Sequence, residues 1–236
     1  MDDFDLGAML DSFVGNLHEK RERRLGFFWA SDLGRCRRQL YYTFIAPLEH
    51  RPATSRAYMV GTILHEFLQK VMLADVGTYK TVTPEKHVSV VDAATGMTVS
   101  GRMDAHIVPK SGEPFVVELK SVNERTFNLG KKPDFAHINQ LNFYMHAEYL
   151  KSGFIVYVNK TNLALRVHRV VYSGPLMRSG LSSLRQTMGD IRQSRLPPRD
   201  DRSGWKCDYC PWNAMCLRND NPALRNRLFP DRKEAA

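Results

Sequence analysis

An acid and a lysine interrupt a segment that otherwise has the composition of a buried β-strand. Val116, Val117 and Leu119 are apolar, and Glu118 and Lys120 stand among them. Residues two apart on a strand point to the same face, so these two charges share one face. Burying them costs stability unless they pair or bind a ligand. A half-exposed strand with a charge pair on its solvent-exposed face would explain the same pattern.

A second acid favours the ligand-binding interpretation. Asp104 lies fourteen residues before Glu118, across a predicted turn, so adjacent strands can bring the two carboxylates together. Paired carboxylates suit a hard cation such as Mg²⁺ or Mn²⁺. Such an ion activates water and stabilises charge that builds up on a phosphate. Lys120 can orient that water or neutralise the developing charge.

Two predicted helices carry polar pairs at four-residue spacing, which places each pair on one helix face. Gly61 and His65 form the first pair, and Gln140 and Tyr144 form the second. Taken alone, a histidine on an amphipathic helix is usually structural. Taken alone, the second pair is a buried tyrosine beside a surface glutamine.

The four cysteines indicate a metal site. Cys207, Cys210 and Cys216 form a C-terminal cluster, and Cys36 lies 171 residues before its first member. The chain begins with acidic residues, which is not typical of a secretory signal. We therefore expect a cytoplasmic, reducing location, where thiols bind metal more often than they form disulfides. Four thiolates suit zinc or a [4Fe–4S] cluster, and zinc sites are commoner; unrelated reduced cysteines are the third alternative.

The composition favours a polyanionic partner. The chain has 236 residues and a formal net charge of +9, so nucleic acid is the first candidate. No stretch approaches the roughly 20 apolar residues of a membrane span. The candidate phosphate contacts, chosen by position and charge, are Arg37, Arg38, Arg125, Lys131 and Lys132.

Apolar periodicity predicts an α/β fold, with a mixed sheet flanked by helices. Helices are expected over 4–20, 31–46, 55–74, 135–150 and 175–195, and strands over 87–92, 97–109, 115–121, 154–159 and 163–171. The first three strands suggest an antiparallel meander, and a polar loop is expected over 123–134. We divide the chain into an N-terminal amphipathic helix with a basic segment (1–30), a single domain (31–217) and a basic tail (218–236).

The order of these motifs resembles the PD-(D/E)XK nuclease superfamily. Asp104 followed by Glu118-x-Lys120 is similar to its catalytic core, although Met103 stands where many members have proline. The segment VGTILHEF around His65 resembles the first motif of the RecB-like exonuclease branch. Gln140 and Tyr144 match that branch's Q-x-x-x-Y motif. Glu85 matches an acidic position sometimes seen there, although it would also fit an exposed turn.

The resemblance implies roles for these residues. His65, Asp104, Glu118 and the backbone carbonyl of Leu119 would hold one or two Mg²⁺ or Mn²⁺ ions. Lys120 would align the attacking water. Gln140 and Tyr144 would help to position the lysine and the DNA strand. The implied fold is a restriction-endonuclease-like core.

The cysteines extend the resemblance to the iron–sulfur members of this branch, among them the CRISPR-associated RecB-like exonucleases and AddB-type nuclease domains. In these proteins one cysteine precedes the nuclease core and three follow it. The resemblance implies a structural [4Fe–4S] cluster on Cys36, Cys207, Cys210 and Cys216 that joins the two ends of the domain.

The expected function is a metal-dependent DNA exonuclease that acts on single strands or DNA ends. The setting would be CRISPR spacer acquisition beside an integrase, or recombination and repair in a bacterium or phage. One alternative is a DNA-binding or scaffold module of the same fold that has lost catalysis. The other is a zinc-stapled nucleic-acid-binding protein. Cleavage polarity and oligomeric state do not follow from the sequence.

Overall fold

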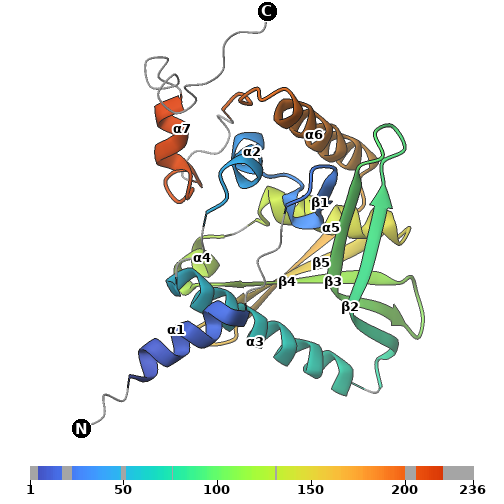
Figure 1. The fold of residues 1–236 in the computed structure, drawn as a ribbon. Coiled ribbons are helices and arrows are strands. Elements are labelled where there is room, and N and C mark those ends of the chain that lie inside the picture. Colours follow the sequence, from blue (N-terminus) through green and yellow to red (C-terminus); the bar gives the residue numbers. More distant parts are fainter. Residues whose placement is uncertain are drawn as a thin grey trace, which may run out of the picture.

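A computed structural model describes residues 5–17, 23–48, 52–75, 77–130, 132–199 and 206–219. It contains one six-stranded mixed sheet with helices on both faces (Figure 1). The strands are β1 (Phe27–Trp29), β2 (Tyr79–Val91), β3 (Thr98–Pro109), β4 (Phe115–Val122), β5 (Ser152–Asn159) and β6 (Leu165–Val171). The helices are α1 (Leu6–Leu17), η1 (a 3₁₀ turn, Ala30–Asp32), α2 (Arg37–Ile45), α3 (Pro52–Ala74), α4 (Glu124–Leu129), α5 (Phe135–Ala147), α6 (Gly174–Arg192) and α7 (Asn213–Asn219).

The central strand β3 has a gap in the pairing along one of its edges. Strand β2 pairs antiparallel with β3 from residue 98 to residue 109 and so occupies one edge. The other edge is shared by β1, parallel at 98–100, and β4, antiparallel at 105–107. Residues 101–104 lie between these two partners. Their outward-facing backbone groups must therefore bond to side chains or to water.

Strands β4, β5 and β6 extend the sheet beyond this gap. β5 lies parallel to β4, with Glu118 opposite Ile155 and Lys120 opposite Tyr157. β6 then pairs antiparallel with β5 as the outermost strand in the described sheet. A parallel pair requires a crossover connection, which α4 and α5 supply.

Two apolar layers hold the helices on the sheet. One face of the sheet packs Ala105, Ile107, Val117 and Leu119 against Leu68 and Met72 of α3. The larger core lies on the other face, where α5 contributes Leu141, Phe143, Tyr144 and Met145 and α6 contributes Met177, Leu184 and Met188. The sheet is therefore sandwiched between α3 on one side and α5 with α6 on the other, as Figure 1 shows.

The structure confirms the predicted α/β class, the antiparallel β2–β3–β4 meander and the main helices. The helix predicted over 31–46 is wrong in its first half, which instead forms η1 and a turn at Gly34. Gly34 has a φ of +73°, and a Cβ there would meet Asn139 at 2.8 Å, so this turn requires glycine. The loop predicted over 123–134 contains α4, which Asn123 caps by accepting from the Thr126 amide at 2.7 Å. No described helix is long and apolar enough to cross a membrane.

Candidate active site

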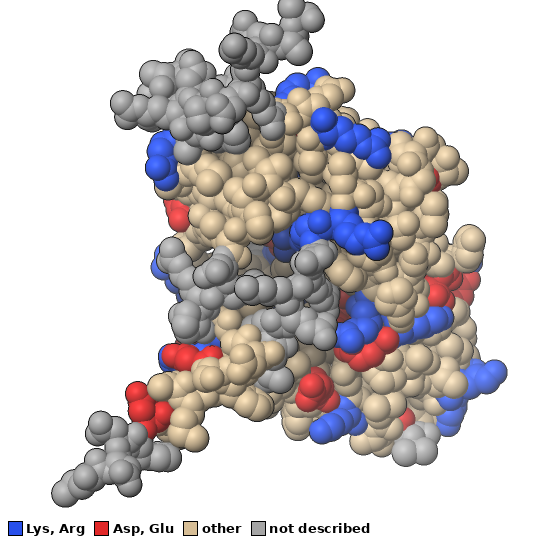
Figure 2. Space-filling model, in the orientation of Figure 1, with Lys and Arg blue, Asp and Glu red and all other residues tan. Residues whose placement is uncertain are grey.

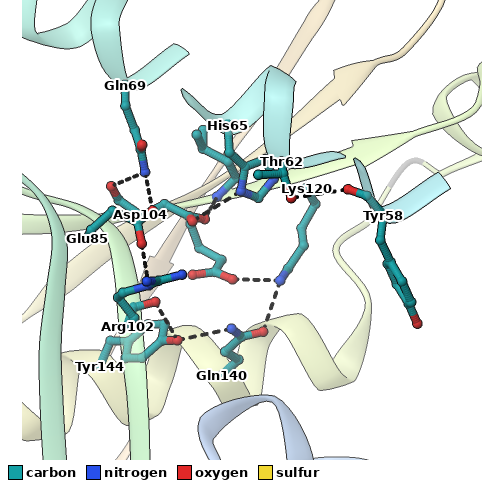
Figure 3. Close-up of polar contacts among 12 residues, drawn as sticks. Tyr58, Thr62, His65, Gln69, Glu85, Arg102, Asp104, Lys120, Gln140 and Tyr144 are labelled. Carbon is teal, nitrogen blue, oxygen red and sulfur yellow. Dashed lines mark hydrogen bonds and ion pairs between the residues drawn. The ribbon is translucent and has the colours of Figure 1, made fainter. Parts of the chain in front are cut away.

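A cleft of about 1100 Å³ opens between α3, the β2–β3 pair and α5. Its walls include His65, Asp104, Gln140 and Tyr144, four of the six predicted catalytic residues. Figure 3 shows these side chains and Lys120 directed toward one another from different elements. The gap in the pairing of β3 lies at this cleft, because residues 101, 102 and 104 line it.

Asp104 lies at the point where the backbone pairing between β3 and β4 ends. The pairing of the two strands begins at Ala105 opposite Val117, and Asp104 is the next residue toward the gap. Its Oδ2 accepts the backbone N–H of Leu119 at 2.6 Å. This bond satisfies a buried backbone donor with a carboxylate oxygen. It also fixes Asp104 beside Glu118, the residue before Leu119.

Glu118 is a buried acid with only one of its oxygens satisfied. The residue is 2% exposed, and its Oε1 accepts from Lys120 Nζ at 2.6 Å. The buried Oε2 has no hydrogen-bond partner among the described residues. Burial raises the pKa of Glu118 to about 7, although the Lys120 ammonium opposes that shift. A carboxylate in this state favours a cation at its second oxygen.

His65 faces the same centre from α3. Its Nδ1 lies 3.2 Å from Asp104 Oδ1. Burial alone would lower the pKa of His65, but the hydrogen bond and the charge of Asp104 raise it overall. The structure therefore brings His65 beside Asp104, with which it was expected to share a metal ion. The ring can serve as a hydrogen-bond partner of Asp104 or, when neutral, as a metal ligand.

A chain of hydrogen bonds fixes Lys120 from the α5 side. Lys120 Nζ donates to Gln140 Oε1 at 3.0 Å, and Gln140 Nε2 donates to the Tyr144 hydroxyl at 3.1 Å. Tyr144 in turn donates to the carbonyl of Arg102 at 3.0 Å, within the gap of β3. Burial raises the pKa of Tyr144, so the phenol stays protonated and keeps donating. The Q-x-x-x-Y pair therefore connects the lysine to the strand that carries Asp104.

Three further polar residues belong to the site, and sequence reasoning missed two of them. Gln69 donates to Glu85 Oε1 at 2.6 Å and to the carbonyl of Asp104 at 3.0 Å. Arg102 forms an ion pair with Glu85. Glu85 is thus part of the cleft, and its φ of +54° is rare for a residue with a side chain. Gln69 lies four residues after His65, so helical spacing was the signal that could have identified it.

In the described residues, neither the predicted Mg²⁺ or Mn²⁺ ligands nor the four cysteines are arranged in the geometry of a complete metal site. Across the described ranges, no group of three or more His, Cys, Asp or Glu side chains is placed so as to hold an ion. The acidic centre nevertheless has the donors that a divalent cation needs. The buried, unpaired Oε2 of Glu118 beside Asp104 is the feature that fits such an ion.

The four cysteines line one cavity of about 400 Å³, apart from the cleft. Burial raises the pKa of Cys210, and the other three thiols are near enough to raise it further. Arg38 Nη1 lies 3.4 Å from Cys216 Sγ, and Trp212 Nε1 donates to the carbonyl of Ala46 at 2.9 Å. The C-terminal segment is therefore bound to α2, and the predicted meeting of the two ends of the domain is present.

The predicted DNA contacts are distributed over different parts of the molecule. Arg37 forms an ion pair with the buried Asp190 of α6, and Arg38 is buried and donates to the carbonyl of Pro197 at 2.9 Å. The structure therefore places neither arginine at the cleft. Arg125 and Lys132 are exposed, and Lys131 lies outside the described residues. Arg23 and Arg102, which were not predicted, do line the cleft.

Comparison with known proteins defines the class. The family described as the PD-(D/E)XK nuclease superfamily matches residues 72–217, and this chain belongs to it. The match covers the strands that carry Asp104, Glu118 and Lys120 and ends one residue beyond Cys216. No curated protein sequence matches the chain.

Three solved structures are similar to this fold. SSO0001 is 19% identical with a TM-score of 0.65, over 90% of this chain and 96% of that one. A protein of Eubacterium rectale with a provisional assignment as an exonuclease is 13% identical with a TM-score of 0.52, over 92% and 98%. The alkaline exonuclease of Laribacter hongkongensis in complex with dAMP is 14% identical with a TM-score of 0.46, over 72% and 90%. The first two share the fold of this chain over nearly its whole length.

Proposed function

We propose that this chain is a metal-dependent DNA exonuclease that hydrolyses phosphodiester bonds at DNA ends or in single strands. The observation that carries the proposal is the convergence of Asp104, Glu118 and Lys120 at the gap of β3. Membership of the nuclease superfamily supports hydrolysis of nucleic acid. The net charge of +9 supports a polyanionic substrate. Such an activity would suit either setting that the sequence suggests, spacer acquisition or recombination and repair.

A divalent cation fits the donors of this site. Asp104, Glu118 and the carbonyl of Leu119 would hold Mg²⁺ or Mn²⁺, with His65 as a further ligand. The Oε2 of Glu118 is buried and finds no hydrogen-bond partner in the part of the chain that the structure describes, so it is the atom that most needs such an ion. When bound, the ion would lower the pKa of a coordinated water and stabilise charge on the scissile phosphate.

The protein's own residues would do the rest of the chemistry. Lys120, fixed between Glu118 and Gln140, would orient the attacking water and balance charge in the transition state. Arg23 and Arg102 at the walls of the cleft would contact backbone phosphates of the substrate. Water is the nucleophile, so the bond from phosphorus to the leaving oxygen breaks as the bond to water forms. No covalent enzyme intermediate is required.

We further propose that the cysteine cavity binds a [4Fe–4S] cluster with a structural role. Four thiols on one cavity form the donor set that this cluster requires. Zinc takes the same donors, so the two are distinguished by colour and metal content. Protein purified without oxygen should be brown, absorb near ~400 nm and contain iron. Cys210→Ser should lose the colour, the absorbance and the iron. The matched control is Tyr209→Ala in the same turn, since Tyr209 is 76% exposed. A colourless protein that contains zinc would contradict this proposal.

The test of the nuclease proposal compares DNA substrates that differ in their ends. Linear DNA labelled at the 5′ or the 3′ end, in single- and double-stranded form, is incubated with Mn²⁺ or with EDTA. Covalently closed circles serve as the substrate without ends. We expect Mn²⁺-dependent loss of linear DNA while the circles remain intact. Equal cleavage of circles would contradict the exonuclease assignment while retaining nuclease activity.

A further inference from the structure

Helix α1 presents an apolar stripe to solvent. Leu6, Met9, Leu10 and Phe13 follow one another at three- and four-residue steps and so lie along one side of the helix. Leu6 is 61% and Phe13 is 62% exposed. On its other side, α1 is attached to α3, because Val14 is buried and Asp11 pairs with Arg56 at 2.6 Å. The arm formed by α1 is mostly tan in Figure 2, without basic side chains along it.

Helix α3 has a second apolar stripe on the side away from the cleft. The exposed apolar residues along this stripe are Val60, Ile63, Phe67 and Val71. At 3.6 residues per turn, they lie roughly opposite Thr62, His65 and Gln69, which line the cleft. The apolar stripe of α3 is therefore turned away from the cleft.

The outer strand of the sheet continues this apolar surface. Leu165, Val167 and Val171 alternate along β6 on one exposed face, and Val167 is 57% exposed. Val167 pairs with Val156, which packs into the apolar layer beneath α3. The turn between β5 and β6 is attached to α3, since Lys160 Nζ donates to the carbonyl of Ala57 at 3.1 Å. The stripe of α3 and the outer face of β6 thus form an apolar corner of the kind that a second helix usually covers.

The charges on α1 and on the corner are opposite in sign. The described part of the α1 segment, residues 5–17, contains Asp5 and Asp11 and no lysine or arginine. Strand β6 contains no acid, and Arg169 is its basic residue on the corner, whereas Arg166 lies on the other face and donates to the carbonyls of Phe127 and Gly130. Arg169 is exposed on the same face as Val167, two residues away. Because Asp11 already pairs with Arg56 of its own chain, Asp5 on α1 and Arg169 on the corner are the opposite charges that can meet across the contact.

We propose that the chain forms a two-fold dimer in which α1 of each copy lies in the corner between α3 and β6 of the other. Contiguous exposed apolar surface of this extent marks an interaction site. The helix and the corner are on the same chain. A two-fold arrangement therefore forms the contact between them twice, once for each copy. The active-site clefts lie on the opposite side of each α3 and stay open to DNA.

The test is the mass of the full chain by light scattering or sedimentation equilibrium across a dilution series. The dimer should have twice the 27.1 kDa of one chain. Phe13→Glu on α1 and Val167→Glu on the corner should each shift the mass to that of one chain. The matched control is Val91→Glu, because Val91 is 63% exposed at the far end of β2. It should leave the dimer intact, and circular dichroism checks that each variant is folded.

Charge reversal tests the partner of α1 without adding a buried charge. Asp5→Lys and Arg169→Glu should each weaken the dimer, raising its dissociation constant about tenfold or less, as is usual for charges at the rim of an interface. The double variant should bind more tightly than either single variant, although it lacks the bond that Asp5 Oδ1 accepts from the Ala8 amide. A wild-type monomer at all concentrations, or dissociation by Val91→Glu as well, would overturn the proposal. A double variant weaker than both single variants would overturn the pairing of α1 with β6.

Discussion

The ammonium of Lys120 on β4 lies 3.0 Å from the amide oxygen of Gln140 on α5. Gln140 also binds Tyr144, and Tyr144 binds the carbonyl of Arg102 in the gap of β3. Side-chain hydrogen bonds thereby join β4, α5 and β3 at the gap in the backbone pairing of β3. In the proposed reaction, Gln140 would therefore be a positioning residue that acts through the lysine.

Gln140→Ala should lower the rate of DNA hydrolysis while leaving DNA affinity nearly unchanged. Without the amide oxygen, the lysine loses one of its two partners and samples other rotamers. We expect a fall in kcat of about tenfold to a hundredfold, as is typical when a reacting group is misplaced. Gln193→Ala, at the exposed end of α6, is the matched control. An equal loss in both variants, or a loss seen only in KM, would argue against positioning.

Glu118→Gln should abolish activity and yet stabilise the metal-free protein at pH 8. The pKa of Glu118 is raised to about 7, above its ordinary value, so the buried charge destabilises the fold increasingly as pH rises from about 4.5 to about 7. Above pH 7 this cost is complete, and removing it should add up to about 3 kcal/mol. Melting curves with and without Mn²⁺ measure the effect. Mn²⁺ should raise the Tm of the wild type and leave that of the variant unchanged; a variant less stable than wild type without metal would contradict this account.

Gly101→Ala should weaken both the fold and the site. A Cβ at this position would lie 2.7 Å from Ala30 Cβ and 2.8 Å from Tyr144 Cε1, closer than real contacts allow. The cost of such overpacking is about 1–3 kcal/mol. Because Tyr144 must move, its bond to Arg102 should be lost and hydrolysis should slow. Gly189→Ala is the control, since among the described residues no atom outside its own stretch of helix lies within 4 Å of the added carbon. Denaturant unfolding measures the free energy of unfolding of both variants. Equal values for Gly101→Ala and Gly189→Ala would disprove the predicted clash.

The stability of the protein should fall between pH 6.5 and pH 4 because of His137. Burial is the main cause that lowers the pKa of His137 to about 4. The positive charges of Lys120, Lys206 and Arg35 lower this pKa further. The carboxylate of Asp134 opposes the shift. A depressed histidine pKa means that the neutral ring is favoured in the fold. Stability is then complete above the unfolded pKa of about 6.5 and is lost as pH falls toward 4, by up to about 3 kcal/mol.

His137→Gln is the variant that isolates this effect. The ring Nδ1 of His137 lies 2.8 Å from the Tyr157 hydroxyl, and a glutamine amide can preserve that bond. Urea denaturation at pH 7 and pH 4.5 should show a smaller loss of stability in the variant than in the wild type. Identical losses in both proteins would show that other groups cause the acid sensitivity.

The sequence predicted the parts of the site that depend on local periodicity. Glu118 and Lys120 share a face because they are two apart on a strand, and Gln140 and Tyr144 do so because they are four apart on a helix. The expectation that His65 lies near Asp104 came from the resemblance to the PD-(D/E)XK superfamily and the order of its motifs. Each of these contacts is present in the structure.

The missed features depend on tertiary pairing, which no local pattern encodes. β1 has three residues, too few for alternation to be visible, yet it forms one border of the gap in β3. Arg102 belongs to the site because that gap exposes it to the cleft beside Glu85. Arg37 was chosen as a phosphate contact by position and charge, but its partner Asp190 lies 153 residues further along the chain.

The most direct test of the central claim is phosphodiester hydrolysis by wild type and Glu118→Gln, measured together with DNA binding. Single-stranded DNA and Mn²⁺ are given to both proteins at equal concentration. The account predicts cleavage by the wild type, loss of cleavage in the variant and similar DNA affinity in both. Wild-type protein that binds DNA but does not cleave it with any divalent metal would contradict the account and favour a silent binding module.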